Sequence, residues 1–282
     1  MTETLFIFND GSFMRSDKLQ ISHNNRSFRY GDGFFETMKW SKGKILLESF
    51  HMERFFHALE TFKFVPPSFL SAGYIINAIT ELVKKNHHQQ LARVRITVYR
   101  GNGGLYDEIS HYPHLLIQTW GLDLTSNKMN ENGLDIGIFT GTVKSPDFFS
   151  TIKSNNYLPY AMAAIWAKER QLNDAVLLNA YGNLVDATFS NLFIVKDGLI
   201  KTPALSEGPI AGVMRRYLLE QLRKNDYLVE ETSLKPADLV AADEVFLTNV
   251  ISGIRWVKQF ENIAYPNQFS ESLYRKFMDI FL

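Results

Sequence analysis

The segment between Lys153 and Arg215 constrains the chain more than any other part of its sequence. It holds a lysine in a Ser/Asn-rich turn, a helical stretch, a single acid (Asp186) in an apolar strand, and then Gly-Pro-Ile-Ala-Gly-Val-Met-Arg, which indicates the start of a helix. Helix N-termini bind anions through their free N–H groups. The segment therefore predicts a ligand site made of an amine, an acid and an anion-binding backbone.

Pyridoxal phosphate needs these three parts in its binding site. An amine joins the cofactor, an anion faces its pyridine nitrogen, and backbone N–H groups bind its phosphate. Taken singly, Lys153 could be a solvated loop lysine and Asp186 an ordinary strand-end acid. The order and the spacing of these residues carry the prediction.

Size and composition limit the class of protein. The 282 residues, 45% of them hydrophobic, are enough for two domains with real cores. The 30 basic and 30 acidic side chains cancel, so no strong field favours nucleic acid or an anionic membrane as a partner. The chain has no cysteine, no signal-peptide pattern and no apolar run near the ~20 residues that span a bilayer. We expect a soluble cytoplasmic protein without a metal site.

Hydrophobic periodicity predicts a mixed α/β (α+β) chain. We expect strands within residues 6–13, 34–40, 44–47, 91–99, 115–120, 134–139, 189–195 and 245–248. We expect helices at 49–62, 71–86, 157–171 and 211–225, the first of them capped by Ser49. The polar segment 123–132 is the expected linker between an N-terminal domain, 1–122, and a C-terminal domain, 133–282, that carries Lys153.

Five motifs in one order add a family resemblance. They are F-R-Y-G-D-G-F-F-E-T at 28–37, H-M-E-R-F at 51–55, K-S-N-N-Y-L at 153–158, L-V-D-A-T-F-S-N-L-F at 184–193 and I-A-G-V-M-R at 210–215. Together they resemble the class IV aminotransferases, the fold-type IV pyridoxal phosphate enzymes, which include D-amino-acid and branched-chain aminotransferases and aminodeoxychorismate lyase. The resemblance implies a two-domain, D-amino-acid aminotransferase-like fold with the cofactor in the interdomain cleft.

The resemblance also implies roles for the residues that match. Lys153 would form the Schiff base and shuttle the proton, as suits an amine made nucleophilic by desolvation. Asp186 stands where the family usually has glutamate, so a closer ring, a bridging water or a less protonated ring nitrogen are all open. The other expected cofactor ligands are Arg54, Gly212, Val213, Thr248 and Asn249 for the phosphate, and Tyr157 for the phenolic oxygen.

Substrate recognition is less constrained by the sequence. Phe35 matches an aromatic pocket position, and bidentate arginine is the natural partner of a substrate carboxylate. The candidate arginines are Arg29, Arg93, Arg95 and Arg100, of which Arg93 and Arg95 share one strand face and could also simply face solvent.

The function predicted from these residues is amino transfer between a small amino acid, D-configured or branched-chain, and a 2-oxo acid such as 2-oxoglutarate. Aminodeoxychorismate lyase is the alternative: Thr37 and Asn249 favour it, whereas Leu105 stands where a basic group would be expected. A non-catalytic cofactor-binding homologue is a third hypothesis, which the intact Lys153 disfavours. The resemblance also implies a homodimer.

Overall fold

The computed structural model describes residues 5–278 and 280, and the chain divides into two compact units. The first comprises Met1–Leu124 with Lys153–Asn156, and the second comprises Thr125–Ile152 with Tyr157–Leu282. The change of unit after Leu124 falls inside the polar segment 123–132. None of the described helices is both long and apolar enough to cross a membrane.

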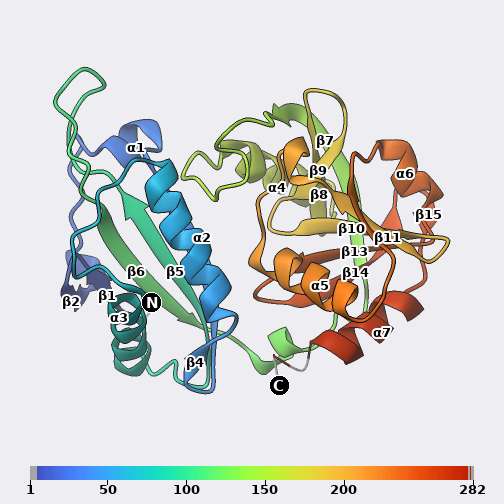
Figure 1. Ribbon diagram of the computed structural model, residues 1–282, viewed down its shortest axis with the longest axis horizontal. Coiled ribbons are helices and arrows are strands. Elements are labelled where there is room, and N and C mark those ends of the chain that lie inside the picture. The colour runs from blue at the N-terminus through green and yellow to red at the C-terminus, as the bar shows by residue number, and fades with distance from the viewer. Residues whose placement is uncertain (1–4, 279, 281–282) are drawn as a thin grey trace. The chain divides into compact units, whose positions relative to one another are not determined.

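The first unit is built on a six-stranded sheet in the order β2-β1-β6-β5-β3-β4 (Figure 1). Its paired strands run antiparallel, with long ladders between β3 and β5 and between β5 and β6. The strands are β1 (Phe6–Asn9), β2 (Ser12–Arg15), β3 (Gly33–Ser41), β4 (Lys44–Ile45), β5 (Leu91–Tyr99) and β6 (His114–Gly121).

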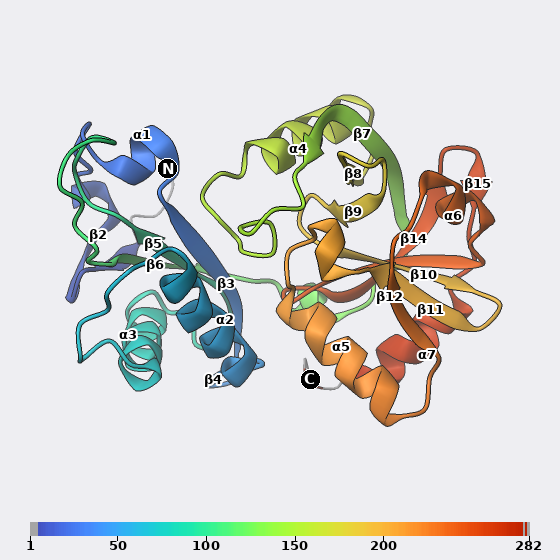
Figure 2. The ribbon, with the colours of Figure 1, turned by 45° about the horizontal axis from the view of Figure 1, so that its top comes forward.

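Helices α2 (Glu48–Thr61) and α3 (Ala72–Lys85) lie along this sheet, and α1 (Arg26–Tyr30) precedes β3 (Figures 1 and 2). The Phe55 ring of α2 meets the Phe34 ring of β3 edge to face at 5.6 Å. Ser71 caps α3 as its position suggests, but the expected Ser49 cap of α2 is wrong. Leu47, in a left-handed conformation (φ 55°), is the N-cap instead, so α2 begins one residue before Ser49.

Strand alternation gives the two faces of this sheet different chemistry. Phe34 and Glu36 point to the face that packs on α2. Phe35, Thr37 and Lys39 point to the opposite face, where Thr37 pairs with Arg95 and Lys39 with Arg93 across the ladder to β5. Hydroxyl, aromatic and cationic groups therefore share the sheet face that is turned away from α2.

The second unit has a nine-stranded mixed sheet, ordered β12-β11-β10-β13-β14-β7-β8-β9, with β15 on β14. Parallel pairs join β7 to β8, β7 to β14 and β11 to β12. The strands are β7 (Leu134–Lys144), β8 (Asp174–Asn179), β9 (Leu184–Ala187), β10 (Asn191–Lys196), β11 (Leu199–Pro203), β12 (Val229–Thr232), β13 (Glu244–Asn249), β14 (Gly253–Phe260) and β15 (Ile263–Ala264).

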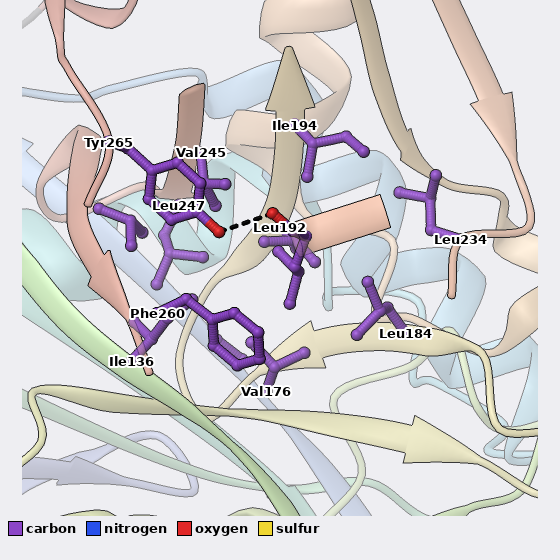
Figure 3. Close-up of a cluster of buried hydrophobic side chains, with 13 residues drawn as sticks. Ile136, Val176, Leu184, Leu192, Ile194, Leu234, Val245, Leu247, Phe260 and Tyr265 are labelled. Atoms are coloured by element: carbon purple, nitrogen blue, oxygen red, sulfur yellow. Dashed lines mark hydrogen bonds between the residues drawn. The ribbon is translucent and has the colours of Figure 1, made fainter. Parts of the chain in front are cut away.

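Two of the apolar clusters that stabilise this unit are formed by the following described residues. One contains Val176, Leu192, Val245 and Phe260, and the Tyr265 hydroxyl there donates to the Leu239 carbonyl at 2.7 Å (Figure 3). The other lies under α4 and includes Phe139, Tyr160, Leu177 and Ile210. The helices are α4 (Leu158–Glu169), α5 (Val213–Lys224), α6 (Pro236–Ala241) and α7 (Gln268–Phe277).

Candidate active site

Lys153 is held against the first unit by backbone pairing. Its carbonyl accepts from Phe35 N at 2.8 Å, and Asn155 N donates to the Gly33 carbonyl at 2.9 Å. The close approach requires glycine at position 33, because a Cβ there would lie 2.2 Å from the Val98 carbonyl oxygen and 2.6 Å from Asn155 Nδ2. This contact explains why residues 153–156 group with the first unit.

The Lys153 ammonium lies on the chemically mixed face of the first sheet. Its Nζ is 4.8 Å from the centre of the Phe35 ring, and the Arg95 guanidinium carbon is 3.7 Å from the same centre. Thr37 is the cross-strand partner of Arg95. The structure thus brings together four of the sequence-predicted residues: the candidate amine, aromatic ring, arginine and hydroxyl.

Lys39 joins this face although the sequence analysis did not single it out. Its side chain is fully buried, it follows Thr37 on the same face, and burial lowers its pKa to about 7. The sequence signal that could have found it is a lysine at i+2 from Thr37 and i+4 from Phe35, on the strand face that those two candidate residues share.

Arg54 belongs to a buried ion-pair cluster on the other face of the same strand. Its Nε donates to Glu36 Oε2 at 3.0 Å and its Nη2 to Glu36 Oε1, while His51 Nδ1 lies 2.7 Å from Oε1. His51 and Glu36 are 0% and 2% exposed at the side chain. Glu36 therefore holds the guanidinium in a fixed orientation, as a fork-to-carboxylate pair does.

The electrostatics of this cluster favour the ionised carboxylate. Burial opposes the charge on Glu36, but Arg54 and His51 outweigh it and lower the pKa to about 2. Burial also lowers the pKa of His51, against the opposing effect of Glu36. His51 Nε2 has no hydrogen-bond partner in the described part of the chain.

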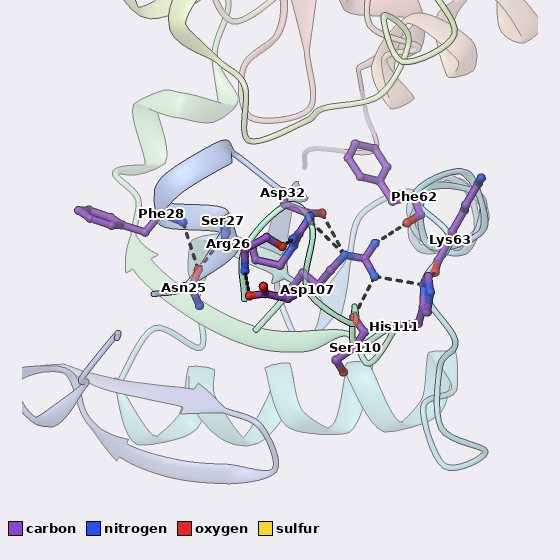
Figure 4. Close-up of polar contacts among 12 residues, drawn as sticks. Asn25, Arg26, Ser27, Phe28, Asp32, Phe62, Lys63, Asp107, Ser110 and His111 are labelled. Atoms are coloured by element: carbon purple, nitrogen blue, oxygen red, sulfur yellow. Dashed lines mark hydrogen bonds and ion pairs between the residues drawn. The ribbon is translucent and has the colours of Figure 1, made fainter. Parts of the chain in front are cut away.

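Arg100 and Arg29 lie in other surroundings. Arg100 is 5% exposed; it donates to Asp32 and to the carbonyls of Phe62 and Ser110 (Figure 4). These contacts join the loop after β5 to the C-terminal end of α2. They give the Arg100 guanidinium a structural role. Arg29 is exposed, with its guanidinium 4.8 Å from the Tyr30 ring centre.

In the second unit, Asp186 lies buried in β9. Its Oδ2 accepts from Ile210 N at 2.9 Å, and the Tyr160 hydroxyl lies 3.1 Å from each of its oxygens. Lys144 Nζ is 3.6 Å from Oδ2. Sequence reasoning missed Lys144 and Tyr160, because a lysine at a strand end and a tyrosine in a helix are ordinary until the fold places them on one acid.

Tyr157 lies beside this group. Its ring stacks on Tyr160 with centres 4.4 Å apart, and its hydroxyl donates to the Thr188 carbonyl at 2.9 Å. A hydroxyl that donates to a carbonyl keeps lone pairs that can accept a hydrogen bond.

The predicted phosphate-binding backbone is arranged around Asn191. Asn191 Nδ2 donates to the Ile210 carbonyl at 2.8 Å, just before α5 with its N-cap Gly212. Across the ladder Asn191 pairs with Thr248, so the two side chains share one sheet face. Asn249 Nδ2 donates to Ser190 Oγ at 3.0 Å. Residues 190 and 191 thus contact both the segment before α5 and the end of β13.

The donors of this arrangement suit a phosphate. N–H groups in the first turn of a helix such as α5 have no intrahelical partner, and the helix dipole favours an anion there. The buried Thr248 hydroxyl has no hydrogen-bond partner among the described residues. Together with the strand acid Asp186, these groups fit a phosphorylated pyridine. Among described residues, no cluster of three or more His, Cys, Asp or Glu could hold a metal.

Gly212→Ala tests this arrangement. A Cβ at residue 212 would lie 1.9 Å from Asn191 Oδ1, so Asn191 must move and release the Ile210 carbonyl. We expect a stability loss of about 1–3 kcal/mol and at least ~10-fold weaker pyridoxal phosphate binding. Thermal unfolding and cofactor titration measure both. Gly73→Ala, in α3 with its nearest neighbouring atom 4.0 Å away, is the control and should change neither.

Comparison with known proteins identifies the family. The family model "Amino-transferase class IV" matches residues 33–260. Aminodeoxychorismate lyase of Vibrio harveyi is 30% identical over 82% of this chain and 83% of its own length. A putative branched-chain-amino-acid aminotransferase of Methanocaldococcus jannaschii is 26% identical over 97% and 96%.

Solved structures support the fold. The branched-chain aminotransferase of Thermoproteus uzoniensis aligns with a TM-score of 0.87 over 99% of this chain and 95% of that one, at 20% identity. The predicted mixed α/β, fold-type IV architecture is therefore confirmed. The family match and the fold agree with the motifs that run from Phe28 to Arg215. The chain belongs to the class IV aminotransferases, a family of pyridoxal-phosphate-dependent enzymes.

Proposed function

We propose that this enzyme transfers the amino group of a small amino acid to a 2-oxo acid such as 2-oxoglutarate. The observation that carries the proposal is Lys153, which is held by backbone hydrogen bonds and whose ammonium lies over Phe35, the ring that the Arg95 guanidinium also contacts. An amine that can take a proton from Cα and a cation that can bind the α-carboxylate, both in contact with one ring, are the groups that amino transfer requires.

Lys153 would hold the cofactor and serve as the proton carrier. When bound, pyridoxal phosphate supplies an electron sink for the carbanion that forms at Cα. Lys153 would carry the proton that leaves Cα in the first half-reaction and would return a proton to Cα in the second.

The family resemblance implies the remaining roles, and the contacts described above support them. Asp186 would face the pyridine nitrogen, and Tyr157 the phenolic oxygen. The phosphate would be bound by Arg54, by the N–H groups near Gly212 and Val213, and by the turn that contains Thr248 and Asn249. A guanidinium oriented by a buried carboxylate and a helix N-terminus are both strong phosphate ligands.

For the substrate, Phe35 and Arg95 are the proposed contacts. The guanidinium stacked on the ring provides one charged and one apolar surface side by side. That combination suits an amino acid with a small aliphatic side chain, either D-configured or branched. Arg100 is not proposed as a substrate ligand, because its donors bind Asp32 and backbone carbonyls.

Aminodeoxychorismate lyase activity is the second candidate. Thr37 favours it, since its side chain lies on the same sheet face as Phe35 and Arg95, where a hydroxyl could reach a substrate. The similarity to the Vibrio harveyi protein of that name supports the same function. Asn249 also matches the expectation for a lyase.

Absorbance scans of the holoenzyme distinguish the two. Panels of L-amino acids, D-amino acids, primary amines and aminodeoxychorismate are mixed with enzyme in single half-reactions. Conversion of the cofactor to its amine form by one amino-acid panel, reversed by 2-oxoglutarate, supports amino transfer and names the stereochemistry. Pyruvate release from aminodeoxychorismate without that conversion would replace amino transfer by the lyase reaction.

We also propose a cytoplasmic homodimer of two-domain subunits, as the family resemblance implies. Light scattering of the purified protein measures the subunit number, and a monomer that retains full activity would contradict it.

A further inference from the structure

Lys144 is a buried cation that the motifs do not include. It lies at the end of β7 with 9% of its surface exposed, and its Nζ contacts the Tyr160 hydroxyl. Its Nζ is 3.6 Å from Asp186 Oδ2. Lysine is rarely buried to this extent without a partner anion, and Asp186 is that partner here.

The contacts around Asp186 leave its charge balanced by one cation. Ile210 N–H and the Tyr160 hydroxyl are neutral donors, so Lys144 supplies the only positive charge in contact with the carboxylate among the described residues. Aspartate is one methylene shorter than glutamate, which keeps the carboxylate close to its own strand and within reach of Lys144.

Other ionisable groups surround the pair. The charge of Asp147 acts to raise the pKa of Lys144. Asp174 lies near Asp186, and Tyr157 lies near Tyr160. The Asp174 Oδ1 atom accepts hydrogen bonds from Ala175 N, Thr188 N and Thr188 Oγ1, so this carboxylate binds its own neighbours rather than Lys144. Burial raises the pKa of Asp186 and lowers that of Lys144, while the attraction between the two opposes both shifts.

A proton shared between Asp186 and a bound pyridine nitrogen can rest on either group. A cation beside the carboxylate stabilises its anionic form more than it destabilises a ring nitrogen on the far side. The same cation does not stabilise the alternative state, in which Asp186 carries the proton and the ring nitrogen is neutral. Charge at residue 144 therefore decides on which of the two atoms the proton resides.

We propose that Lys144 is a positioning residue that keeps Asp186 ionised and so directs the shared proton onto the ring nitrogen of pyridoxal phosphate. The proposal rests on the proposed role of Asp186 as the partner of that nitrogen. Tyr160 links the two charges, accepting from Lys144 and donating to Asp186.

The first experiment uses the protein without cofactor. Aspartate labelled with ¹³C at the side-chain carboxyl reports ionisation, and the Asp186 signal is assigned by its absence from Asp186→Asn. We expect Lys144→Met to move the Asp186 midpoint to higher pH, and Lys144→Arg to restore it. An unchanged midpoint in Lys144→Met would refute the coupling, whether or not the protein binds pyridoxal phosphate.

The second experiment uses pyridoxal phosphate labelled with ¹⁵N in the ring. We expect the bound cofactor to give a protonated-nitrogen signal in the parent and in Lys144→Arg, and a neutral-nitrogen signal in Lys144→Met. If Lys144→Met does not fold, Lys144→Gln gives the same comparison with a polar side chain. A protonated signal in every folded variant would overturn the proposal while leaving the proposed function intact.

Failure of the proposed function gives a different pattern. In that case no amino-acid panel would convert the cofactor in the half-reaction scans, yet the carboxyl and ring-nitrogen signals would still report on Lys144 and Asp186. Tyr160→Phe provides the matched control for packing, because it removes the hydroxyl between the charges but keeps both. We expect the ring nitrogen of pyridoxal phosphate bound to Tyr160→Phe to remain protonated.

Discussion

Lys153→Ala is expected to lower turnover with every amino donor by ~1,000-fold or more, because it removes the amine that carries the proton. The carbonyl of residue 153 still pairs with Phe35 N, so the fold should persist. Steady-state rates and thermal unfolding measured on one preparation separate the two effects. In the parent protein, borohydride reduction followed by peptide mapping should place the cofactor on Lys153.

Two comparisons make this result specific. Lys168→Ala, at an exposed position of α4, should leave both the rate and the mapped peptide unchanged. A small primary amine added to Lys153→Ala should restore part of the rate, because it replaces the missing proton carrier. Attachment of the cofactor to Lys144 instead would show that the sequence motif had misassigned the lysine.

Glu36→Ala is expected to destabilise the protein by about 3–5 kcal/mol, because it leaves the Arg54 guanidinium and the His51 ring without their shared anion in a buried place. Denaturant unfolding measures the loss. Glu60→Ala on the exposed side of α2 should change stability by less than ~0.5 kcal/mol. An equally small effect for Glu36→Ala would show that the cluster does not hold Arg54 in place.

The same carboxylate predicts how stability depends on pH. Its pKa is about 2 in the folded protein against 4.5 for an unperturbed glutamate, so the folded state favours the ionised form. That stabilisation, about 3 kcal/mol, is present above pH 4.5 and is lost as the pH falls toward 2. Glu36→Gln should flatten the stability curve in this window, which chemical unfolding at a series of pH values tests.

The sequence alone carried the family, the cofactor and the mixed α/β class. It could do so because the motifs between Phe28 and Arg215 are local: each is a short run whose chemistry is readable without partners. The Gly-Pro-Ile-Ala-Gly run predicted a helix start, and α5 begins at Val213 with Gly212 as its N-cap. The helix expected at 71–86 is also found, as α3 (Ala72–Lys85).

Other local predictions failed where the backbone took an unusual path. Ser49 does not cap α2, because Leu47 adopts a left-handed conformation that starts the helix earlier, and a leucine in that region is not expected from propensity. Arg100 looked like a substrate arginine because it begins a glycine-rich loop. Its burial against Asp32 and the carbonyls of Phe62 and Ser110 depends on segments far apart in the chain.

The sequence by itself determined that this chain is a pyridoxal-phosphate-dependent class IV aminotransferase family member with Lys153 in the motif of its lysine. Only the tertiary structure decided which charges meet: Glu36 with Arg54 and His51, and Asp186 with Lys144 and Tyr160. The reason is physical. Motifs show which groups are present, but the pKa of a buried group depends on neighbours that the fold brings from distant strands and helices.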